Sequence, residues 1–372
     1  MTPAGGRLRS LDVFRGATVA AMLLVNAPGS EAPTFIYLQH MSWHGWTPTD
    51  LIFPAFLFIL GVAIPFAYAK CLEPGYPRRK GDLQALKRGV LLVGVGLVGG
   101  IPLDSYGYFR LTGVLQRIGV CYAGAALAFL HARRRTLTAA VLVLIAGYWA
   151  LLRLVPVPGY GPGVLSPAGN LASYVDRLVL GPRMSNAVYD PEGLLSTIPA
   201  LATSLAGVLT GAWLRTSPDG ILRLGGAGAA LAALGLLWGH WLPLNKHIYT
   251  SSYALFGCGF SMATLALLHW LVDRRGARVW TRPFELFGVH AFFAYCGSSL
   301  LEAIVDLGHF SLPDGATGTA RVWMRTRLFG WLTPKGGSLA FAILWVLFWY
   351  VAVVLWARAK AARSAKAKAL QR

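Results

Sequence analysis

The chain has 372 residues, of which 55% are hydrophobic and only 13% are charged, and its mean hydropathy is +0.54. This composition excludes a water-soluble globular core and indicates a polytopic membrane protein. The formal net charge of +19 would suggest a nucleic-acid partner in a soluble chain. Here the cations gather in loops between apolar segments, which is typical of membrane topology and of contact with anionic headgroups. We therefore expect the lipid bilayer as a partner and no nucleic acid.

Apolar segments near the ~20 residues needed to cross a ~30 Å hydrocarbon layer recur along the chain. We predict spans over residues 13–27, 51–69, 89–103, 112–130, 137–155, 194–214, 222–241, 252–272, 284–305 and 338–357. This pattern predicts an all-α integral membrane protein, a bundle of about ten transmembrane helices in a single domain over residues 1–372. Arg15 interrupts the first apolar segment and no small-residue cleavage site follows it, so we expect a retained span rather than a signal peptide.

The distribution of Lys and Arg orients the predicted bundle. With the N-terminus in the cytoplasm, the cytoplasmic segments hold 24 of the 34 Lys and Arg residues, as the positive-inside rule requires. The C-terminus is then also cytoplasmic, and residues 358–372 form a basic, solvated or headgroup-bound tail. We expect a multi-pass protein of the cell (inner) membrane. Two long extracytoplasmic segments, 159–188 and the loop before the last span, have room for short surface helices.

The cysteines and histidines give no framework for a disulfide or a metal site. All four cysteines lie in or beside apolar segments, and no CxxC pair is present. Only His40 and His44 have a spacing that resembles a ligand pair. We expect no metal, although an extracytoplasmic metal protein remains an alternative.

The segment 37–54, between the first two predicted spans, has more titratable and aromatic residues than a simple connecting loop needs. It holds His40, His44, two tryptophans and Asp50, and no Lys or Arg. Titratable groups packed against hydrophobic sequence at a membrane boundary favour a functional role. The alternative is an interfacial aromatic belt with solvated histidines.

The predicted topology brings further polar residues to the same side of the membrane. They are Asn26, Gln116, Arg117, Glu192, Asn245, Lys246, Thr250, Ser251, Ser252 and Glu302. A charge at the centre of a membrane helix costs roughly 2.5–3.5 kcal/mol on insertion scales, so Arg117 needs an acidic partner. Asp50, at the same expected depth, is the first candidate. We predict one polar cavity in the outer half of the bundle, and the alternative is an ion-pair network with no chemistry.

Several ordered motifs carry a resemblance to a known family. They are Arg9-Ser-Leu-Asp12-Val-Phe-Arg15-Gly16, Val25-Asn26-Ala-Pro-Gly29, residues 40–54, Gly113-Val-Leu-Gln116-Arg117-Ile, and residues 189–199, 243–252 and 283–288. With them the chain resembles the heparan-α-glucosaminide N-acetyltransferase family over nearly its whole length, as a bacterial-type homologue without the luminal N-terminal domain of lysosomal members. The resemblance implies a transmembrane acyltransferase fold, in which cytosolic acetyl-CoA acetylates an acceptor on the far side. It also implies that His40 is catalytic and that Asn26 lies beside the acetyl group.

The residues suit this chemistry without the resemblance. Acetyl transfer from a thioester to an amine needs a base or nucleophile with a pKa near neutral, and the unperturbed pKa of histidine is about 6.5. An asparagine amide suits stabilisation of the oxyanion. His40 could act as a general base or carry the acetyl group itself. We assign His40, Asn26 and Asp50 to catalysis, Asp12, Arg15, Gln116 and Arg117 to the cofactor, and Trp43, Glu192, Asn245, Lys246, Ser251 and Ser252 to the acceptor.

A membrane transporter is the main alternative class. About ten spans, intramembrane charge and an outer polar cavity would also suit a sugar or small-molecule permease. Transporters often consist of two related halves with paired broken helices, and no internal repeat is evident here. From the resemblance we expect an extracytoplasmic amino sugar or glycan as the acceptor, and the resemblance also suggests a homodimer.

Overall fold

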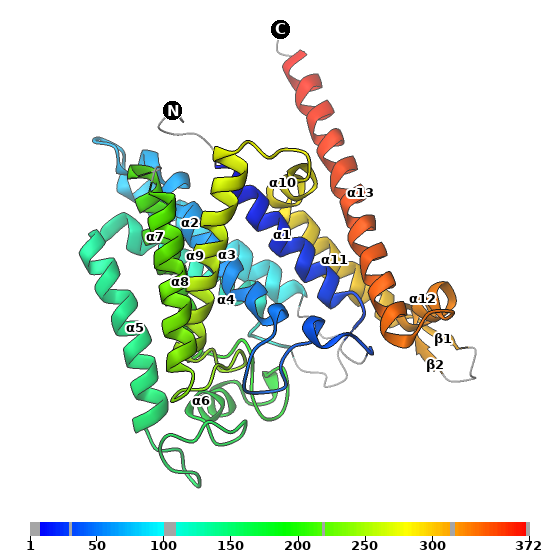
Figure 1. Ribbon diagram of the computed structural model, residues 1–372, viewed down its shortest axis with the longest axis horizontal. Helices are drawn as coiled ribbons and strands as arrows, with labels where there is room; N and C mark the ends of the chain where they lie inside the picture. The colour runs from blue at the N-terminus through cyan, green and yellow to red at the C-terminus, as the bar shows by residue number, and fades with distance from the viewer. Residues whose placement is uncertain (1–7, 30–31, 100–108, 218–219, 313–316, 370–372) are drawn as a thin grey trace. The chain divides into compact units, whose positions relative to one another are not determined.

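The structure is a computed structural model that describes residues 8–29, 32–99, 109–217, 220–312 and 317–369 (Figure 1). Its long helices are α1 (Arg9–Asn26), α2 (Ile52–Ala67), α3 (Arg78–Gly99), α4 (Val114–His131), α5 (Arg134–Leu154), α7 (Thr197–Thr216), α8 (Ile221–Trp238), α9 (Ser251–Leu268), α11 (Ala291–Leu307) and α13 (Pro334–Ala369). The shorter elements are α6 (Leu171–Leu180), α10 (Thr281–Val289), α12 (Ala320–Phe329), β1 (His309–Ser311) and β2 (Thr317–Thr319). These elements confirm the all-α fold class.

Most of the long helices are suited to a bilayer. Among the described residues, seven helices are long and apolar enough to cross a membrane, and the bent pair α10–α11 makes an eighth if it counts as one span. Every predicted span coincides with a long helix or with this pair, although residues 100–103 of the third span lie outside the described residues. This arrangement confirms a polytopic membrane protein. The helices α1 and α3 begin with several charged residues, so the total of ten spans stays a prediction.

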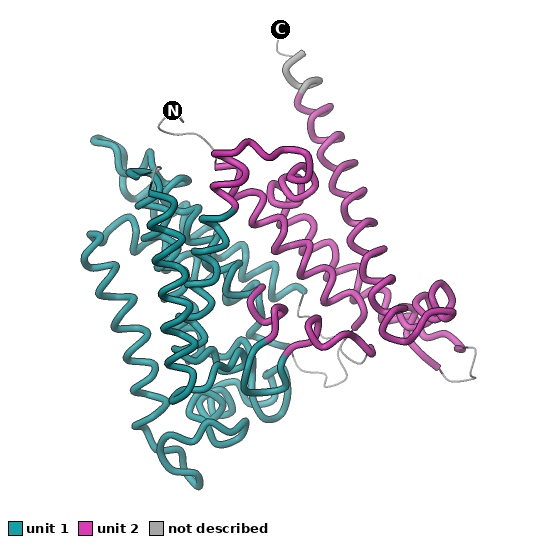
Figure 2. The backbone as a smooth tube through the Cα atoms, viewed as in Figure 1, with its two compact units in different colours: residues 1–7, 41–46, 53–267 teal, residues 8–40, 47–52, 268–372 magenta. Residues whose placement is uncertain are grey.

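The chain forms two compact units (Figure 2). As far as they are described, the first unit comprises residues 41–46 and 53–267, and the second comprises residues 8–40, 47–52 and 268–372. The second unit therefore joins the first helix of the chain to its last four helices. The segment that the sequence singled out contributes to both units, since it supplies His44 to the first and His40 with Asp50 to the second.

In the first unit, α2 and α7 meet backbone to backbone. A Cβ atom on Gly61 would lie 2.0 Å from the carbonyl oxygen of Ser204, and one on Gly207 would lie 2.2 Å from that of Phe58. Any side chain at either position would force the helices apart. Small residues at such crossings are typical of membrane helices, because close approach increases van der Waals contact without a hydrophobic driving force.

The second unit pairs α1 with α10 in the same way. A Cβ atom on Gly16 would lie 1.7 Å from the carbonyl oxygen of Phe284, and one on Gly288 would lie 1.9 Å from that of Asp12. After Val289 the chain bends by 79° into α11, so the ninth predicted span is two helices rather than one. The expected basic tail continues α13 as helix to Ala369.

The two long extracytoplasmic segments of the sequence prediction contain secondary structure. The first includes α6, and the second includes α12, which confirms that these loops hold short helices. The second loop also contains the antiparallel hairpin β1–β2, with His309 opposite Thr319, which the sequence did not predict. The hairpin leads directly into α12 and so fixes where that helix begins.

Candidate functional site

His40 and Asp50, both in the second unit, form a hydrogen-bonded pair. Nδ1 of His40 lies 2.8 Å from Oδ1 of Asp50. The Asp50 side chain is fully buried, whereas that of His40 is 43% exposed. A carboxylate only accepts hydrogen bonds, so the neutral imidazole carries its proton on Nδ1 and Nε2 is its basic atom. The pair thus combines an accessible titratable ring with a buried group that sets its tautomer.

The sequence Thr47-Pro-Thr-Asp50 explains how the carboxylate reaches this position. It forms a capping box at a short 3-10 helix, Pro48–Leu51, in which the backbone N–H of Thr47 donates to Oδ2 of Asp50 at 3.0 Å. The Thr47 hydroxyl donates to the carbonyl oxygen of Gln39 at 2.6 Å, which ties the residue before His40 to the same turn. One carboxylate oxygen therefore holds the backbone and the other holds the imidazole, and the orientation of His40 follows from a local fold.

Asn26 is the last residue of α1, and its side chain is exposed. The helix that carries it contacts the 3-10 helix that carries Asp50. The structure thus assembles the helix of one predicted catalytic residue and the turn of another in the second unit.

Asp12 and Arg15, two of the residues assigned to the cofactor, lie together on α1. Nη1 of Arg15 lies 3.4 Å from Oδ1 of Asp12 and donates to the carbonyl oxygen of Gly288 at 3.3 Å. Gly288 is near the end of α10, where free carbonyl groups favour a cation. The Arg15 side chain is 26% exposed, so it is only partly covered by the fold.

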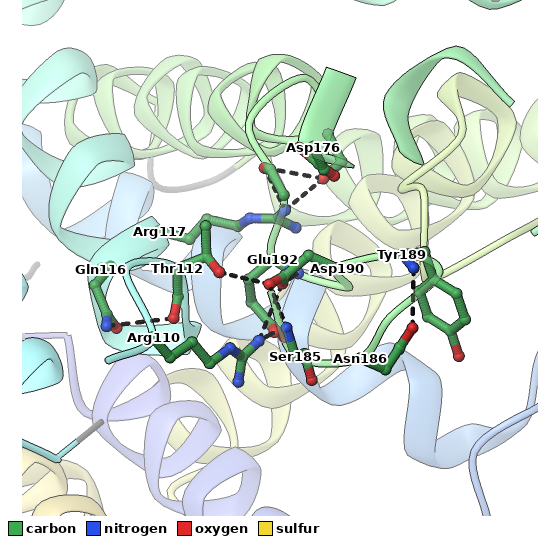
Figure 3. Close-up of polar contacts among 12 residues, drawn as sticks. Arg110, Thr112, Gln116, Arg117, Asp176, Ser185, Asn186, Tyr189, Asp190 and Glu192 are labelled. Atoms are coloured by element: carbon green, nitrogen blue, oxygen red, sulfur yellow. Dashed lines mark hydrogen bonds and ion pairs between the residues drawn. The ribbon is translucent and has the colours of Figure 1, made fainter. Parts of the chain in front are cut away.

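Figure 3 shows a polar network in the first unit that joins the start of α4 to the loop before α7. Nη2 of Arg110 lies 3.0 Å from Oδ1 of Asp190 and 2.7 Å from Oε2 of Glu192. The hydroxyl of Thr112 and the backbone N–H of Ser185 donate to Oδ2 of Asp190 at 2.6 and 2.8 Å. Burial alone would raise the pKa of Asp190, but the charge of Arg110 and these hydrogen bonds outweigh it and lower the pKa.

Arg117 is buried in the same part of the fold (Figure 3). Its Nη2 donates to the carbonyl oxygen of Gly193 at 2.9 Å and to the hydroxyl of Ser196. These contacts with neutral oxygens lie within the first unit, and the expected ion pair of Arg117 with Asp50 of the second unit stays a prediction. Asp176 of α6 is an acidic group of this unit that feels the charge of Arg117. Burial raises the pKa of Asp176 to about 6, and the hydrogen bond from Leu194 N–H and the charge of Arg117 oppose that shift.

Gln116, the remaining residue assigned to the cofactor, is buried one turn into α4. Its Nε2 donates to the carbonyl oxygen of Thr112 at 3.4 Å. A Cβ atom on Gly96 of α3 would lie 2.4 Å from its Oε1, so the side chain fills the contact between α3 and α4. This position gives Gln116 a packing role beside the network of Figure 3.

An aromatic cluster lies beside this network in the first unit. The rings of Trp43 and His247 are stacked with centroids 5.4 Å apart and an interplanar angle of 7°. Tyr189 meets both rings edge-on, at 5.0 Å from Trp43 and 5.1 Å from His247. Neither Tyr189 nor His247 was assigned to the site from the sequence. Their positions next to Asp190 and Lys246, inside two polar motifs, are the signal that could have found them.

His44 belongs to the first unit and has a different partner from His40. Its Nδ1 lies 3.3 Å from Nδ2 of Asn245, so Nδ1 acts as the acceptor and Asn245 as the donor. Burial lowers the pKa of His44 and thus favours the neutral ring. The two histidines of one short loop are therefore held in different ways, one by a carboxylate and one by an amide.

Three residues assigned to the acceptor instead hold the backbone before α9. Oδ1 of Asn245 accepts the N–H of Ile248 at 3.1 Å. The hydroxyl of Ser251 donates to the carbonyl oxygen of Ile145 at 2.7 Å, and that of Ser252 donates to the carbonyl oxygen of Leu242 at 2.6 Å. All three side chains are fully buried, so their polar groups need partners within the protein. These contacts give Asn245, Ser251 and Ser252 a structural role, and the assignment of all three and of the half-buried Lys246 to the acceptor stays a prediction.

Comparison with known proteins identifies the family. The family model described as heparan-alpha-glucosaminide N-acetyltransferase, catalytic, matches residues 7–218. The chain belongs to the heparan-α-glucosaminide N-acetyltransferase family. It is 31% identical over 358 residues to the Homo sapiens protein of that name, across 80% of this chain and 53% of that protein. It is 29% identical over 361 residues to the Mus musculus protein, across 80% of this chain and 54% of that protein.

The chain spans about half the length of these curated relatives of the heparan-α-glucosaminide N-acetyltransferase family. The matched region, residues 7–218, contains His40, Asp50 and Asn26 as well as the network of Figure 3. The described residues include no group of three His, Cys, Asp or Glu side chains placed to hold a metal ion. The titratable pair His40–Asp50 lies in the matched region and is a feature from which a reaction can be argued.

Proposed function

We propose that the protein is a transmembrane acetyltransferase, which moves the acetyl group of cytosolic acetyl-CoA to an amino sugar or glycan on the extracytoplasmic side. The pairing of an exposed imidazole with a fully buried carboxylate carries the proposal. The names of the two relatives describe N-acetyl transfer to a glucosaminide. A base with a pKa near neutral is what this transfer requires.

The same dyad serves either of two routes. In direct transfer, Nε2 of His40 takes a proton from the acceptor amine. At the same time the amine nitrogen attacks the thioester carbonyl, and the C–S bond then breaks to release CoA. In the two-step route, Nε2 attacks the thioester carbonyl and CoA leaves as the thiolate. The amine then displaces the imidazole from the acetyl group, and the freed Nε2 takes the proton that the amine loses. Both routes develop positive charge on the ring, which the hydrogen bond to Asp50 stabilises. The amide of Asn26 is our proposed donor to the oxyanion.

Binding of the two substrates falls to different parts of the chain. Arg15 is the better candidate for a CoA phosphate, because its side chain is partly exposed. Arg117 is only 3% exposed and already donates to the loop before α7, so we propose that it shapes the site rather than holding phosphate. For the acceptor, the stacked rings of Trp43 and His247 offer an apolar face, and the half-buried Glu192 and Lys246 offer charge.

Acetyl-CoA should raise the melting temperature of the detergent-solubilised protein. A ligand that binds only the folded state stabilises it by about 2.7 kcal/mol at a concentration 100 times its Kd. The measurement is a thermal shift series with acetyl-CoA, with ATP as a control for nonspecific phosphate binding, checked by calorimetry. A permease or a metal protein should show no response. Absence of both a shift and calorimetric heat at millimolar acetyl-CoA would rule out the acetyltransferase.

The proposed sidedness predicts a labelling pattern in intact cells. A cysteine in place of Ser166, in the loop before α6, should react with an impermeant maleimide added outside, whereas a cysteine in place of Ser364, near the end of α13, should not. Both serines are exposed. The parent protein with its four native cysteines, three of them buried, gives the background. The reverse pattern would contradict the orientation derived from the Lys and Arg distribution.

A further inference from the structure

The C-terminal turn of α1, which ends at Asn26, is held by an arginine from α12. Nη1 of Arg321 donates to the carbonyl oxygen of Asn26 at 3.2 Å and to that of Ala27 at 3.4 Å. The last carbonyl groups of a helix lack intrahelical partners and carry partial negative charge, so a cation is favourable there. The last turn of α1 has no basic residue of its own. Arg321 supplies that cation from 295 residues further along the chain.

Arg321 is itself fixed by Asp306 in the last turn of α11. Its Nε donates to Oδ1 of Asp306 at 3.0 Å, and its Nη2 donates to Oδ2. The pair therefore has the two-pronged geometry in which guanidinium and carboxylate match each other. Only 11% of the Arg321 side chain is exposed. With two nitrogens bound to Asp306, the third is aimed at α1, and a lysine could not reproduce both contacts.

The backbone next to Asn26 is immobilised while its side chain stays accessible. Ala27 is buried with Phe341 and Ala342 of α13 in a small apolar cluster. The carbonyl groups of Asn26 and Ala27 are bound to Arg321. The Asn26 side chain, in contrast, is exposed. Two different contacts, one apolar and one ionic, thus restrict the backbone from which the amide projects.

We infer that Arg321 is a positioning residue for acetyl transfer, acting through the carbonyl groups of Asn26 and Ala27 to fix the Asn26 amide where the oxyanion develops. This inference rests on the proposed function. Misplacement of a catalytic group by about 1 Å can lower a rate about 10²-fold. Arg321→Lys keeps the charge but loses the two-pronged contact. It should lower kcat about 10- to 100-fold with little change in the KM for acetyl-CoA.

A double-mutant cycle distinguishes positioning from general damage to the fold. The variants are Arg321→Lys, Asn26→Ala and the double variant, each measured for kcat, KM and melting temperature. If Arg321 acts through the amide, its substitution should cost much less in the Asn26→Ala background than in the wild type, because the effects of residues acting as a unit do not add. Arg327→Lys is the matched control, since Arg327 lies on the same helix, is exposed and only faces the ring of Trp323.

Each outcome bears on a different claim. Wild-type kcat in Arg321→Lys, or an equal loss in both backgrounds, would overturn the positioning role. If the wild-type protein does not transfer acetyl groups, the proposed function itself fails and the inference fails with it. Should Arg321→Lys not fold, Asp306→Asn loosens the same arginine from its other side and runs through the same cycle.

Discussion

Replacing His40 with alanine should lower the rate of acetyl transfer about 10²–10⁴-fold, the usual contribution of a positioned acid–base group. The buried carboxylate of Asp50 fixes the ring through Nδ1, so the variant removes the basic Nε2 together with its orientation. Binding of acetyl-CoA should largely survive, because the imidazole does not hold the nucleotide end. The measurement is turnover with glucosamine as the acceptor, beside a calorimetric titration with acetyl-CoA.

His44→Ala is the matched control, since it removes the same ring four residues later. His44 contacts the amide of Asn245 rather than a carboxylate, so its loss should cost much less. The assignment is wrong if His40→Ala keeps near wild-type turnover while His44→Ala abolishes it. If His40→Ala loses acetyl-CoA binding together with turnover, His40 holds the donor or the fold and is not the chemical base.

Replacing Asp190 with alanine should destabilise the folded protein by about 3–5 kcal/mol, the usual cost of removing one partner of a buried ion pair. The Asp190 side chain is fully buried, and its loss leaves Arg110, Thr112 and the N–H groups of Ser185 and Glu192 short of an acceptor. The check is the melting temperature and urea midpoint of the purified protein in detergent. No acyl-transfer chemistry enters this prediction.

The control for this variant is Asp82→Asn, in the same unit. Asp82 pairs with His131 at 2.8 Å, but 28% of its side chain and 48% of that of His131 are exposed. Such an exposed pair contributes at most about 1 kcal/mol. The pKa of Asp190 is lower in the folded protein than in the unfolded chain. Its contribution to the free energy of unfolding is therefore fully present above the unfolded-state pKa of about 3.9, and it is lost as the pH falls through the folded-state pKa. The difference in the free energy of unfolding between Asp190→Ala and the wild type should therefore become smaller in acid. Equal stabilities of the two proteins at pH 7 would refute the role of the network.

Apolar patterning was enough to predict the helices, because a chain in lipid can satisfy its backbone only within helices of that length. Apolar patterning was not enough to predict where a single apolar segment is divided into two helices or where the last helix ends. The bend after Val289 falls inside one apolar segment, and nothing in the hydropathy marks it. The basic residues 358–369 indicate solvation by their charge, yet Ala, Lys and Arg are good helix formers, and α13 continues through them.

The candidate site was predictable where it is local. The capping box of Thr47 and Asp50 can be read from the sequence, and it holds the carboxylate that bonds to His40. Contacts between distant segments could not be predicted. The Arg321 contact with Asn26 and the backbone role of Ser251 depend on which loop reaches which helix end, and a single sequence contains no direct signal for that.

The composition of the second unit has a consequence for biosynthesis. The helix α1 is synthesised long before its packing partner α10, and Arg9 and Glu285, which form an ion pair, are 276 residues apart. At translation rates of about 5–20 residues per second, α1 has to wait on the order of 15 to 55 seconds for that partner. During this interval its charged first turn and the bare glycine surface at Gly16 have no native cover. This chain would therefore depend most on a membrane insertase or chaperone in the interval after α1 is inserted and before α10 is made.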